Sequence, residues 1–447
     1  MAAAHDRTLA MSRRLHPAWL AMLLLGLGLA LVMLTHPALV VALELGLGLL
    51  LLACLAYAKP VWAMAGWLLV VESSPEMWLS DLIGHHEVII AVLKAAGLSI
   101  IALAALRDGA RFDRSNPSFA FGAMFIGGLV HGFWPGLTLL ASIRSLIGSA
   151  APFAAGFLRL TAPMRRTIIA VTIIGPVLTV GFGAMLDALG VRDLLGYQQG
   201  ALRLAAASSP AFLGGFAMIG IYAALLAYLR TGQSRLLGWI GIDFAVLVAT
   251  GARAPLGLAS AVVLITLITI PSPRLTMQRR LVLLSLLGAL GGIVLLALPD
   301  FSFIRVIDLW RLGEAGDLSN RTLIWPAFER AIAASPWLGW GVGAGKVVVN
   351  LHSALGELLG TNAAHCEYLR IPTEGGLLGA ALLLGLLVLW LWRGSHRLPA
   401  DQRRVIRLVF FAFAVQSLTD NTLIATTSLA FFTWARAVLV FADERAD

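Results

Sequence analysis

The chain has 447 residues, of which 59% are hydrophobic and 13% are charged, and its formal net charge is +9. Soluble domains are about 45–50% apolar and about 25% charged, so the composition excludes an ordinary soluble protein, and long apolar runs without two-residue alternation exclude a β-barrel. The positive charge does not indicate nucleic-acid binding, because Lys and Arg gather in short loops between apolar runs, as in helical membrane proteins.

Apolar runs of bilayer-crossing length, about 20 residues, recur along the chain. They predict an all-α, polytopic integral membrane protein with about 12–14 transmembrane helices and one large periplasmic loop. Arg7, Arg13 and Arg14 precede the first run, which we expect to be an uncleaved helix because a second run follows closely. The two cysteines, Cys54 and Cys366, give no disulfide framework. The candidate spans are residues 18–34, 38–57, 60–72, 87–106, 118–134, 137–158, 167–187, 207–229, 236–251, 254–270, 281–298, 376–392, 405–419 and 422–441.

Arginine-rich loops alternate with arginine-poor ones, which predicts the orientation. The arginine-rich loops are residues 107–114, 159–166, 230–235, 274–280 and 393–404. They are expected to share one face with both termini, and the positive-inside bias makes that face cytoplasmic. The opposite face then holds the turns 72–87 and 192–203 and the long loop 299–375.

This alternation predicts three regions of the chain. Residues 1–298 are expected to form an N-terminal transmembrane helix bundle, residues 299–375 a periplasmic loop with the candidate catalytic residues, and residues 376–447 the C-terminal transmembrane helices. We expect a multi-pass protein of the bacterial inner membrane whose active site faces the periplasm. Because no ATP is available there, a synthetic reaction in this loop must use an activated substrate.

Two arginines outside the long loop are candidate anion-binding residues. Arg253 lies between two apolar runs at the outer boundary, where an ionisable residue suggests function; the alternative is an arginine that anchors a helix end. Arg144 lies in an ambiguous span, either near the outer boundary or buried. An intramembrane arginine needs a partner or an anionic ligand, and Asp243 is a possible partner.

Arg321 opens an amphipathic segment of the long loop. With Asn320 as N-cap, Arg321, Trp325 and Phe328 would share one helical face, although Pro326 makes the first turns irregular. A guanidinium beside helix-end amides suits a phosphate group. The alternative is a surface salt bridge to an acidic residue of the same loop.

His365 is the candidate catalytic base. It stands in a run that is expected to begin the helix returning into the membrane, with Tyr368 and Leu369 on the same face. An imidazole titrates near neutral pH and can accept a proton from an attacking hydroxyl, but a histidine here can also be a plain interface residue. Tyr368 is a supporting residue, and Glu374 either caps the next span or orients the histidine.

Two further patterns resemble ligand sites but do not have the residues that such sites require. The glycine-rich run ending at Lys346 is typical of a re-entry loop and not of a nucleotide loop, because no buried strand precedes it and no Ser or Thr follows the lysine. His352, His365 and Cys366 lack the spacing of zinc ligands. We therefore expect no metal and no cofactor.

Four strings of the long loop and the segment after it are distinctive. They are residues 321–325 (Arg-Thr-Leu-Ile-Trp), 335–343 (Ser-Pro-Trp-Leu-Gly-Trp-Gly-Val-Gly), 365–369 (His-Cys-Glu-Tyr-Leu) and 374–379 (Glu-Gly-Gly-Leu-Leu-Gly). With these strings the chain resembles the bacterial O-antigen ligase and polymerase superfamily, the WaaL and Wzy type of membrane glycosyltransferases. Cys366 replaces the asparagine that is usual after the histidine. Residues 250–253 are similar to the family's Ser-Arg-Gly patch, with Ala252 for serine and Ala254 for glycine.

The resemblance implies a reaction and its partners. The donor would be a glycan on undecaprenyl diphosphate, and the acceptor would be a sugar hydroxyl on lipid A core (ligase) or on another lipid-linked unit of an O-antigen or exopolysaccharide (polymerase). Arg253, Arg321 and Arg144 would hold the diphosphate and His365 would activate the acceptor, without a metal and with inversion. Ligase and polymerase share these motifs, so the choice between them stays open.

Other functions remain as alternatives. A transporter or flippase of lipid-linked oligosaccharide would place its charges near the bilayer midplane, whereas these charges are expected at the outer face. A noncatalytic assembly scaffold would tolerate the loss of His365. A peptidoglycan-type polymerase would be expected to use a loop carboxylate.

Overall fold

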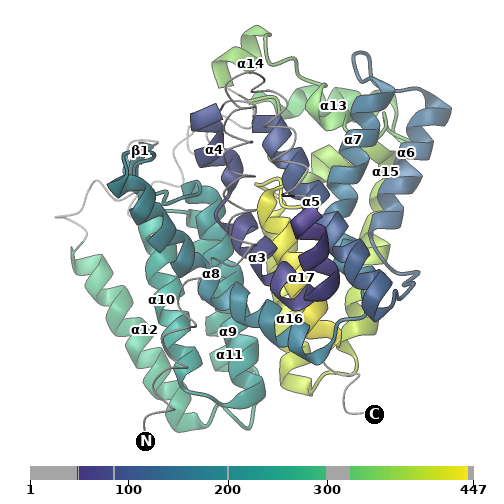
Figure 1. The fold of residues 1–447 in the computed structure, drawn as a ribbon. Coiled ribbons are helices and arrows are strands. Elements are labelled where there is room, and N and C mark those ends of the chain that lie inside the picture. Colours follow the sequence, from purple (N-terminus) through teal and green to yellow (C-terminus); the bar gives the residue numbers. More distant parts are fainter. Residues whose placement is uncertain are drawn as a thin grey trace, which may run out of the picture.

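The computed structural model describes residues 48, 50–83, 86–198, 201–297, 323–359 and 361–440. In these residues the fold is helical apart from one short hairpin, which confirms the predicted all-α class (Figure 1). Five helices are long and apolar enough to cross a membrane, and four shorter apolar helices accompany them in this part of the chain. The protein is therefore a multi-pass membrane protein.

The first half of the described chain contains α3 to α9 and the hairpin. Its elements are α3 (Pro60–Glu72), α4 (Pro75–Ile83), α5 (His86–Asp108), α6 (Ser118–His131), α7 (Leu139–Ala150), the 3-10 helix η1 (Ala151–Phe157), α8 (Ala162–Ala188), β1 (Leu195–Gln198), β2 (Ala201–Leu204) and α9 (Pro210–Thr231). The strands are antiparallel, with Leu195 opposite Leu204.

The second half contains α10 to α17. Its elements are α10 (Arg235–Thr250), α11 (Arg253–Thr269), α12 (Met277–Ala297), α13 (Trp325–Ala334), the 3-10 helix η5 (Ala344–Lys346), α14 (Ala354–Leu359), α15 (Glu367–Ser395), α16 (Ala400–Gln416) and α17 (Thr426–Val440).

Local sequence signals fix several helix boundaries. Thr161 and Ser209 are N-caps whose hydroxyls accept hydrogen bonds from the amides of Met164 and Phe212, and each is followed by a proline in the first turn. Gly232 and Gly251 end α9 and α10 in the left-handed conformation that glycine adopts without steric cost. These caps explain why the predicted spans 207–229 and 236–251 agree closely with α9 and α10.

Helix α9 lies at the centre of the bundle, and most of its length is buried. It packs against α8, α10, α11, α16 and α17. Figure 1 shows α10, α11 and α12 on one side of the molecule and α6, α7 and α15 on the other. The aromatic rings of Phe413 and Phe431 stack at 4.5 Å between α16 and α17. One hydrophobic cluster runs through the bundle from Ala56 to Leu439.

Two predicted spans differ from the structure in detail. Residues 137–158 correspond to the membrane-span candidate Leu139–Phe157, in which the α-helix ends at Ala150 and a 3-10 helix containing Pro152 follows. The span 376–392 lies in α15, where two helices meet at a kink at Gly376, so the predicted start coincides with the kink and a further helix precedes it from Glu367. The helix expected to contain Trp325 and Phe328 is α13. The hairpin, α4 and α14 were not predicted.

The loops of the described chain fall on two ends of the bundle. One end holds the arginine-rich loops, and we call it the basic end. There Ala110 pairs with Leu158, the Tyr228 hydroxyl donates to the Arg274 carbonyl, and the Ser272 hydroxyl donates to the Asp401 carboxylate. At the other end, Ser74 contacts Ser208 and Thr426 donates to Glu76. Figure 1 shows α4, α13, α14 and β1 together at this second end, which we call the His365 end.

Glycines allow the loop 335–343 to nest against the bundle at the His365 end. The amides of Trp340 and Gly341 donate to the carbonyls of Thr373 and Glu374, both at 2.9 Å. Gly376 adopts φ 60° and ψ −170°, a conformation open essentially only to glycine, and a Cβ there would collide with the backbone of Trp337. The two glycine-containing strings of the sequence are thus complementary packing surfaces.

We expect Gly376→Ala to destabilise the protein by about 2 kcal/mol or more, because it combines backbone strain with a steric collision. Gly385→Ala is the matched control on the same helix, since a Cβ at Gly385 meets nothing within 4 Å. The control should leave stability equal or higher by up to about 1 kcal/mol. Thermal unfolding in detergent measures both, and equal midpoints would contradict the packing argument.

Candidate active site at the His365 end

His365 lies immediately before α15 rather than in its first turn. The helix begins at Glu367 with Cys366 as N-cap, and His365 has a left-handed backbone with φ 48°. The run that contains His365 begins the helix as expected, but His365 itself precedes the helix, so the expected helical face shared with Tyr368 is not formed. A non-glycine residue in this conformation carries strain of about 1–3 kcal/mol, which persists only where surrounding contacts fix it.

Two side chains contact the imidazole of His365. The Thr361 hydroxyl oxygen lies 3.3 Å from Nε2, and the Asn421 side-chain nitrogen lies 3.4 Å from Nδ1. Thr361 Oγ1 also accepts a hydrogen bond from the Ala363 amide, so its own hydroxyl proton is available to Nε2. Both ring nitrogens are thus held, one from the loop before α15 and one from the α16–α17 loop.

A buried ion triad follows His365 along α15. Arg370 Nε lies 2.6 Å from Glu367 Oε2, and Arg370 Nη1 lies 3.0 Å from Glu374 Oε2. All three side chains are at most 4% exposed. Their spacing of three and four residues places them on one helix face, as expected for neighbours on an α-helix. Glu374 was predicted to cap the next span or to orient the histidine; the structure places it in this triad.

The triad connects α15 to the loop that carries Asn421. Glu367 Oε1 accepts from the Leu423 amide at 2.8 Å, and the Glu367 amide donates to the Ser417 carbonyl at 2.9 Å. The loop is braced further by a 2.5 Å hydrogen bond between the hydroxyls of Ser417 and Thr422. These bonds fix Asn421 relative to the start of α15, and so relative to His365.

Residues 323–364 add a small core beside the histidine. Ile324, Phe328, Val349 and Ala364 form a hydrophobic cluster of their own. The Trp325 indole donates to the carbonyl of Ala364, the residue before His365, at 3.0 Å. Helix α13 begins at Trp325; Arg321 and the predicted cap Asn320 lie outside the described residues.

A group of cations lies near this site. Lys94 on α5 interacts electrostatically with Arg144 on α7, Lys346 in η5 and Arg370 on α15. Its ammonium also donates to the Gly148 carbonyl at 3.4 Å. Arg144 is exposed, while its neighbour Ser142 is buried and donates to the Val342 carbonyl at 2.7 Å. We call Lys94, Arg144 and Lys346 the cation group.

Backbone and side-chain contacts place the cation group at the same end of the bundle as the histidine. Asn362, three residues before His365, donates to the Lys346 backbone carbonyl at 2.7 Å. Lys94 interacts with Glu76, whose carboxylate accepts from Thr426 at the start of α17.

Within the described residues, the structure does not bring the remaining predicted residues into contact with His365. Arg253 is half-buried at the first position of α11, and α9 stands between it and the start of α17, with Gly214 against Ala252 and Gly215 against Thr427. Tyr368 is 51% exposed, and its hydroxyl donates to the Ala414 carbonyl of α16. Asp243, a suggested partner of Arg144, is buried against Gly220 of α9.

The glycine-rich run and Cys366 are packed against neighbouring elements. The run 339–346 packs against α15 and α7, with Gly343 beside Ser145 and Gly345 beside Arg370. Burial raises the pKa of the Cys366 thiol, so the thiol is neutral at ordinary pH and unsuited to nucleophilic attack. No group of metal-binding side chains is present among the described residues.

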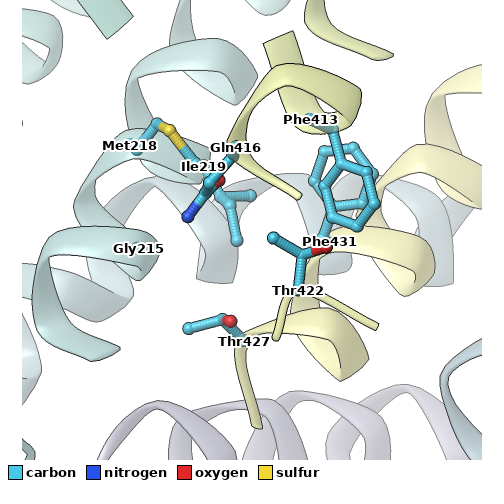
Figure 2. A pocket seen from close by; sticks show the side chains of 8 residues that line it. All are labelled: Gly215, Met218, Ile219, Phe413, Gln416, Thr422, Thr427 and Phe431. Atoms are coloured by element: carbon cyan, nitrogen blue, oxygen red, sulfur yellow. The ribbon is translucent and has the colours of Figure 1, made fainter. Parts of the chain in front are cut away.

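A small hollow borders the Asn421 loop between α9, α16 and α17 (Figure 2). Its volume is about 10 Å³, close to the space that one water needs. Gln416, Thr422 and Thr427 supply its polar side chains, and Phe413 and Phe431 line its apolar side, as Figure 2 shows. The hollow is too small for a sugar and is a packing feature behind the site.

Sequence reasoning missed Thr361, Asn421, Lys94 and the ion triad as a unit. Asn421 lies in a short polar run between two spans at the same end as His365, and that position was a usable signal. Lys94 is a single charge inside an apolar span, which is a functional signal by itself. Nothing in the sequence alone pairs Asn421 with a histidine 56 residues away.

We expect Arg370→Met to destabilise the protein by about 3–5 kcal/mol, because it leaves two buried carboxylates without their partner. The triple variant Glu367→Gln, Arg370→Met, Glu374→Gln removes all the charges and should recover part of the loss. Thermal unfolding of both variants checks this. A triple variant no more stable than Arg370→Met would show that the charges are not the source of the effect.

The comparisons with known proteins give one result for this region. Residues 238–384 match the family model described as O-Antigen ligase. The matched segment runs from α10 into α15 and contains Arg253, Arg321, His365, Tyr368 and Glu374, but not Arg144. No curated protein and no solved structure matches the chain.

Proposed function

We propose that the chain transfers a glycan from undecaprenyl diphosphate to a sugar hydroxyl, and the match of residues 238–384 to the O-antigen ligase family model supports this proposal. The acceptor is lipid A core or a second lipid-linked glycan. The protein acts in the bacterial inner membrane, with the His365 end in the periplasm and the basic end in the cytoplasm. The positive-inside rule supports this orientation. The transporter alternative is not favoured, because the family is one of glycosyltransferases.

The observation that carries the proposal is an imidazole contacted at both ring nitrogens, at the end of the bundle that also holds three cations. A glycosyl diphosphate reacts readily only when the charge that develops on the departing phosphate is stabilised, and preorganised cations provide this. An acceptor hydroxyl needs a base within hydrogen-bonding reach. The His365 end provides both kinds of group.

The proposed reaction is a single displacement. His365 accepts the proton of the acceptor hydroxyl while the hydroxyl oxygen forms a bond to the anomeric carbon. The bond from that carbon to the phosphate oxygen breaks, and undecaprenyl diphosphate leaves with the electron pair. Attack from the face opposite the leaving group inverts the anomeric centre. Arg253, Arg321 and Arg144 contact the diphosphate, and Lys94 and Lys346 add positive charge beside Arg144.

Asn421 is proposed to set the tautomer of His365. Its Oδ1 is buried and has no hydrogen-bond partner among the described residues, while its Nδ2 faces Nδ1 of the ring. Rotating the amide by half a turn pairs Oδ1 with an Nδ1–H and removes a buried unsatisfied carbonyl, which costs about 1–3 kcal/mol. Nε2 then accepts from the Thr361 hydroxyl, a position that the acceptor hydroxyl takes in the reaction.

We expect His365→Ala to lower glycan transfer by about 10²–10⁴-fold, because the proton acceptor is lost. His352→Ala is the matched control, since His352 is an exposed histidine of the same loop. Arg321→Ala should also abolish transfer if it binds the diphosphate. Product formation from purified protein with lipid-linked donor and acceptor measures all three. Normal transfer by His365→Ala, in protein that inserts and unfolds like the wild type, would refute the base assignment.

We expect Asn421→Ala to lower kcat by about 10–100-fold with little change in the donor KM, because it disturbs the histidine but not the diphosphate contacts. Asn421→Asp should retain more activity, since a carboxylate also accepts from Nδ1–H. Steady-state kinetics separates the two constants. Equal losses in kcat for Ala and Asp, or a change confined to KM, would contradict the positioning role.

A further inference from the structure

A second site lies at the basic end, opposite His365. A cavity of about 390 Å³ opens between the α5–α6 loop, the last turns of α15 and the end of α17. Among the described residues, its charged lining consists of Arg111, Arg114, Arg393, Arg397, Arg436 and one carboxylate, Asp113. The volume falls in the range of small-ligand pockets, about 300–1,000 Å³.

The depth of this cavity separates it from an ordinary basic surface. Arg393 and Arg397 are exposed at its rim, as the positive-inside rule predicts for a cytoplasmic loop. Arg436 is only 6% exposed and lies with the buried Trp390 in the lining. Orientation in the membrane does not require a buried arginine, because only loop charges set it.

The carboxylate of the lining is already engaged. Asp113 Oδ1 accepts from the Ser115 amide at 3.0 Å and from the Ser115 hydroxyl at 2.6 Å. These bonds hold the α5–α6 loop in shape, and the Arg111 amide fixes it to the Phe157 carbonyl at 2.8 Å. In the described part of the lining, guanidinium groups outnumber carboxylates, and the carboxylate present has a local structural role.

Close helix packing forms the wall of the cavity. Gly394 lies against Leu439, and a Cβ at Gly394 would come 2.9 Å from the Leu439 Cβ. Because the glycine brings the ends of α15 and α17 together, Arg393, Arg397 and Arg436 converge on one space. The site is thus built by tertiary packing from three distant segments.

We propose that this cavity binds the phosphate headgroup of an anionic phospholipid from the adjacent leaflet. Guanidinium groups bind phosphate oxygens in fork geometry, and basic pockets between transmembrane helices at the cytoplasmic side suit multiply charged headgroups such as that of cardiolipin. Phe112, 72% exposed, provides apolar surface next to the arginines for an acyl chain. This inference is independent of the glycan-transfer proposal, because the two sites lie at opposite ends of the bundle.

The test is native mass spectrometry of the full-length detergent-solubilised protein titrated with cardiolipin, with phosphatidylcholine as the neutral comparison. We expect cardiolipin to be retained in preference to phosphatidylcholine. Arg393→Gln/Arg397→Gln should weaken cardiolipin binding about 30-fold, the product of about fivefold for each arginine. Arg436→Gln should weaken it too; if that variant does not fold, the rim double variant still decides, since both rim side chains are exposed.

The control is Arg166→Gln/Arg235→Gln, which removes the same charge from exposed positions at the same end but outside the cavity. It should retain cardiolipin like the wild type. Equal loss in the control would overturn the proposal, because it would indicate general attraction to a basic face. Displacement of cardiolipin by inorganic phosphate with no preference for the lipid would also overturn it, since the ligand would then be a soluble anion.

Discussion

Burial of the Glu367–Arg370–Glu374 triad is the constraint on which the His365 end depends. Three charges can be buried together at the start of an apolar helix only if each finds partners, because an uncompensated buried charge costs several kcal/mol. Arg370 is paired on both sides, and Glu367 also accepts the Leu423 amide. Satisfying these groups requires the α16–α17 loop to lie directly against α15, and this contact brings Asn421 to His365.

Close approach of backbones is the second requirement, and glycine provides it. The loop 335–343 packs on α15 because Gly339, Gly341 and Gly376 occupy backbone conformations with positive φ where a Cβ would collide. The same loop presents the Val342 carbonyl to Ser142, which fixes α7 and hence the position of Arg144. The glycines that look like a flexible linker in the sequence are therefore a rigid contact between α15 and α7.

The two ends of the bundle use positive charge differently. At the His365 end, few cations stand near a strained histidine, and they come from helices far apart in sequence. At the basic end, many arginines lie in the loops that orient the protein, and some of them converge on a cavity because Gly394 lets α15 and α17 approach. Charge count alone does not distinguish these situations; convergence on a shared space does.

The sequence by itself determined the membrane class and most of the described helix positions. An apolar run is recognised from the composition of about 20 consecutive residues and needs no information about distant contacts. For this reason α3, α5 and α8 to α11 lie close to their predicted ranges. It also identified His365 as the candidate base through a local string. The left-handed turn at His365, its contacts with Thr361 and Asn421, the ion triad and the cation group were decided only by tertiary structure. These features depend on contacts between side chains that are far apart in the sequence. Glu76 and Thr426, for example, are 350 positions apart. No local sequence pattern predicts such a contact.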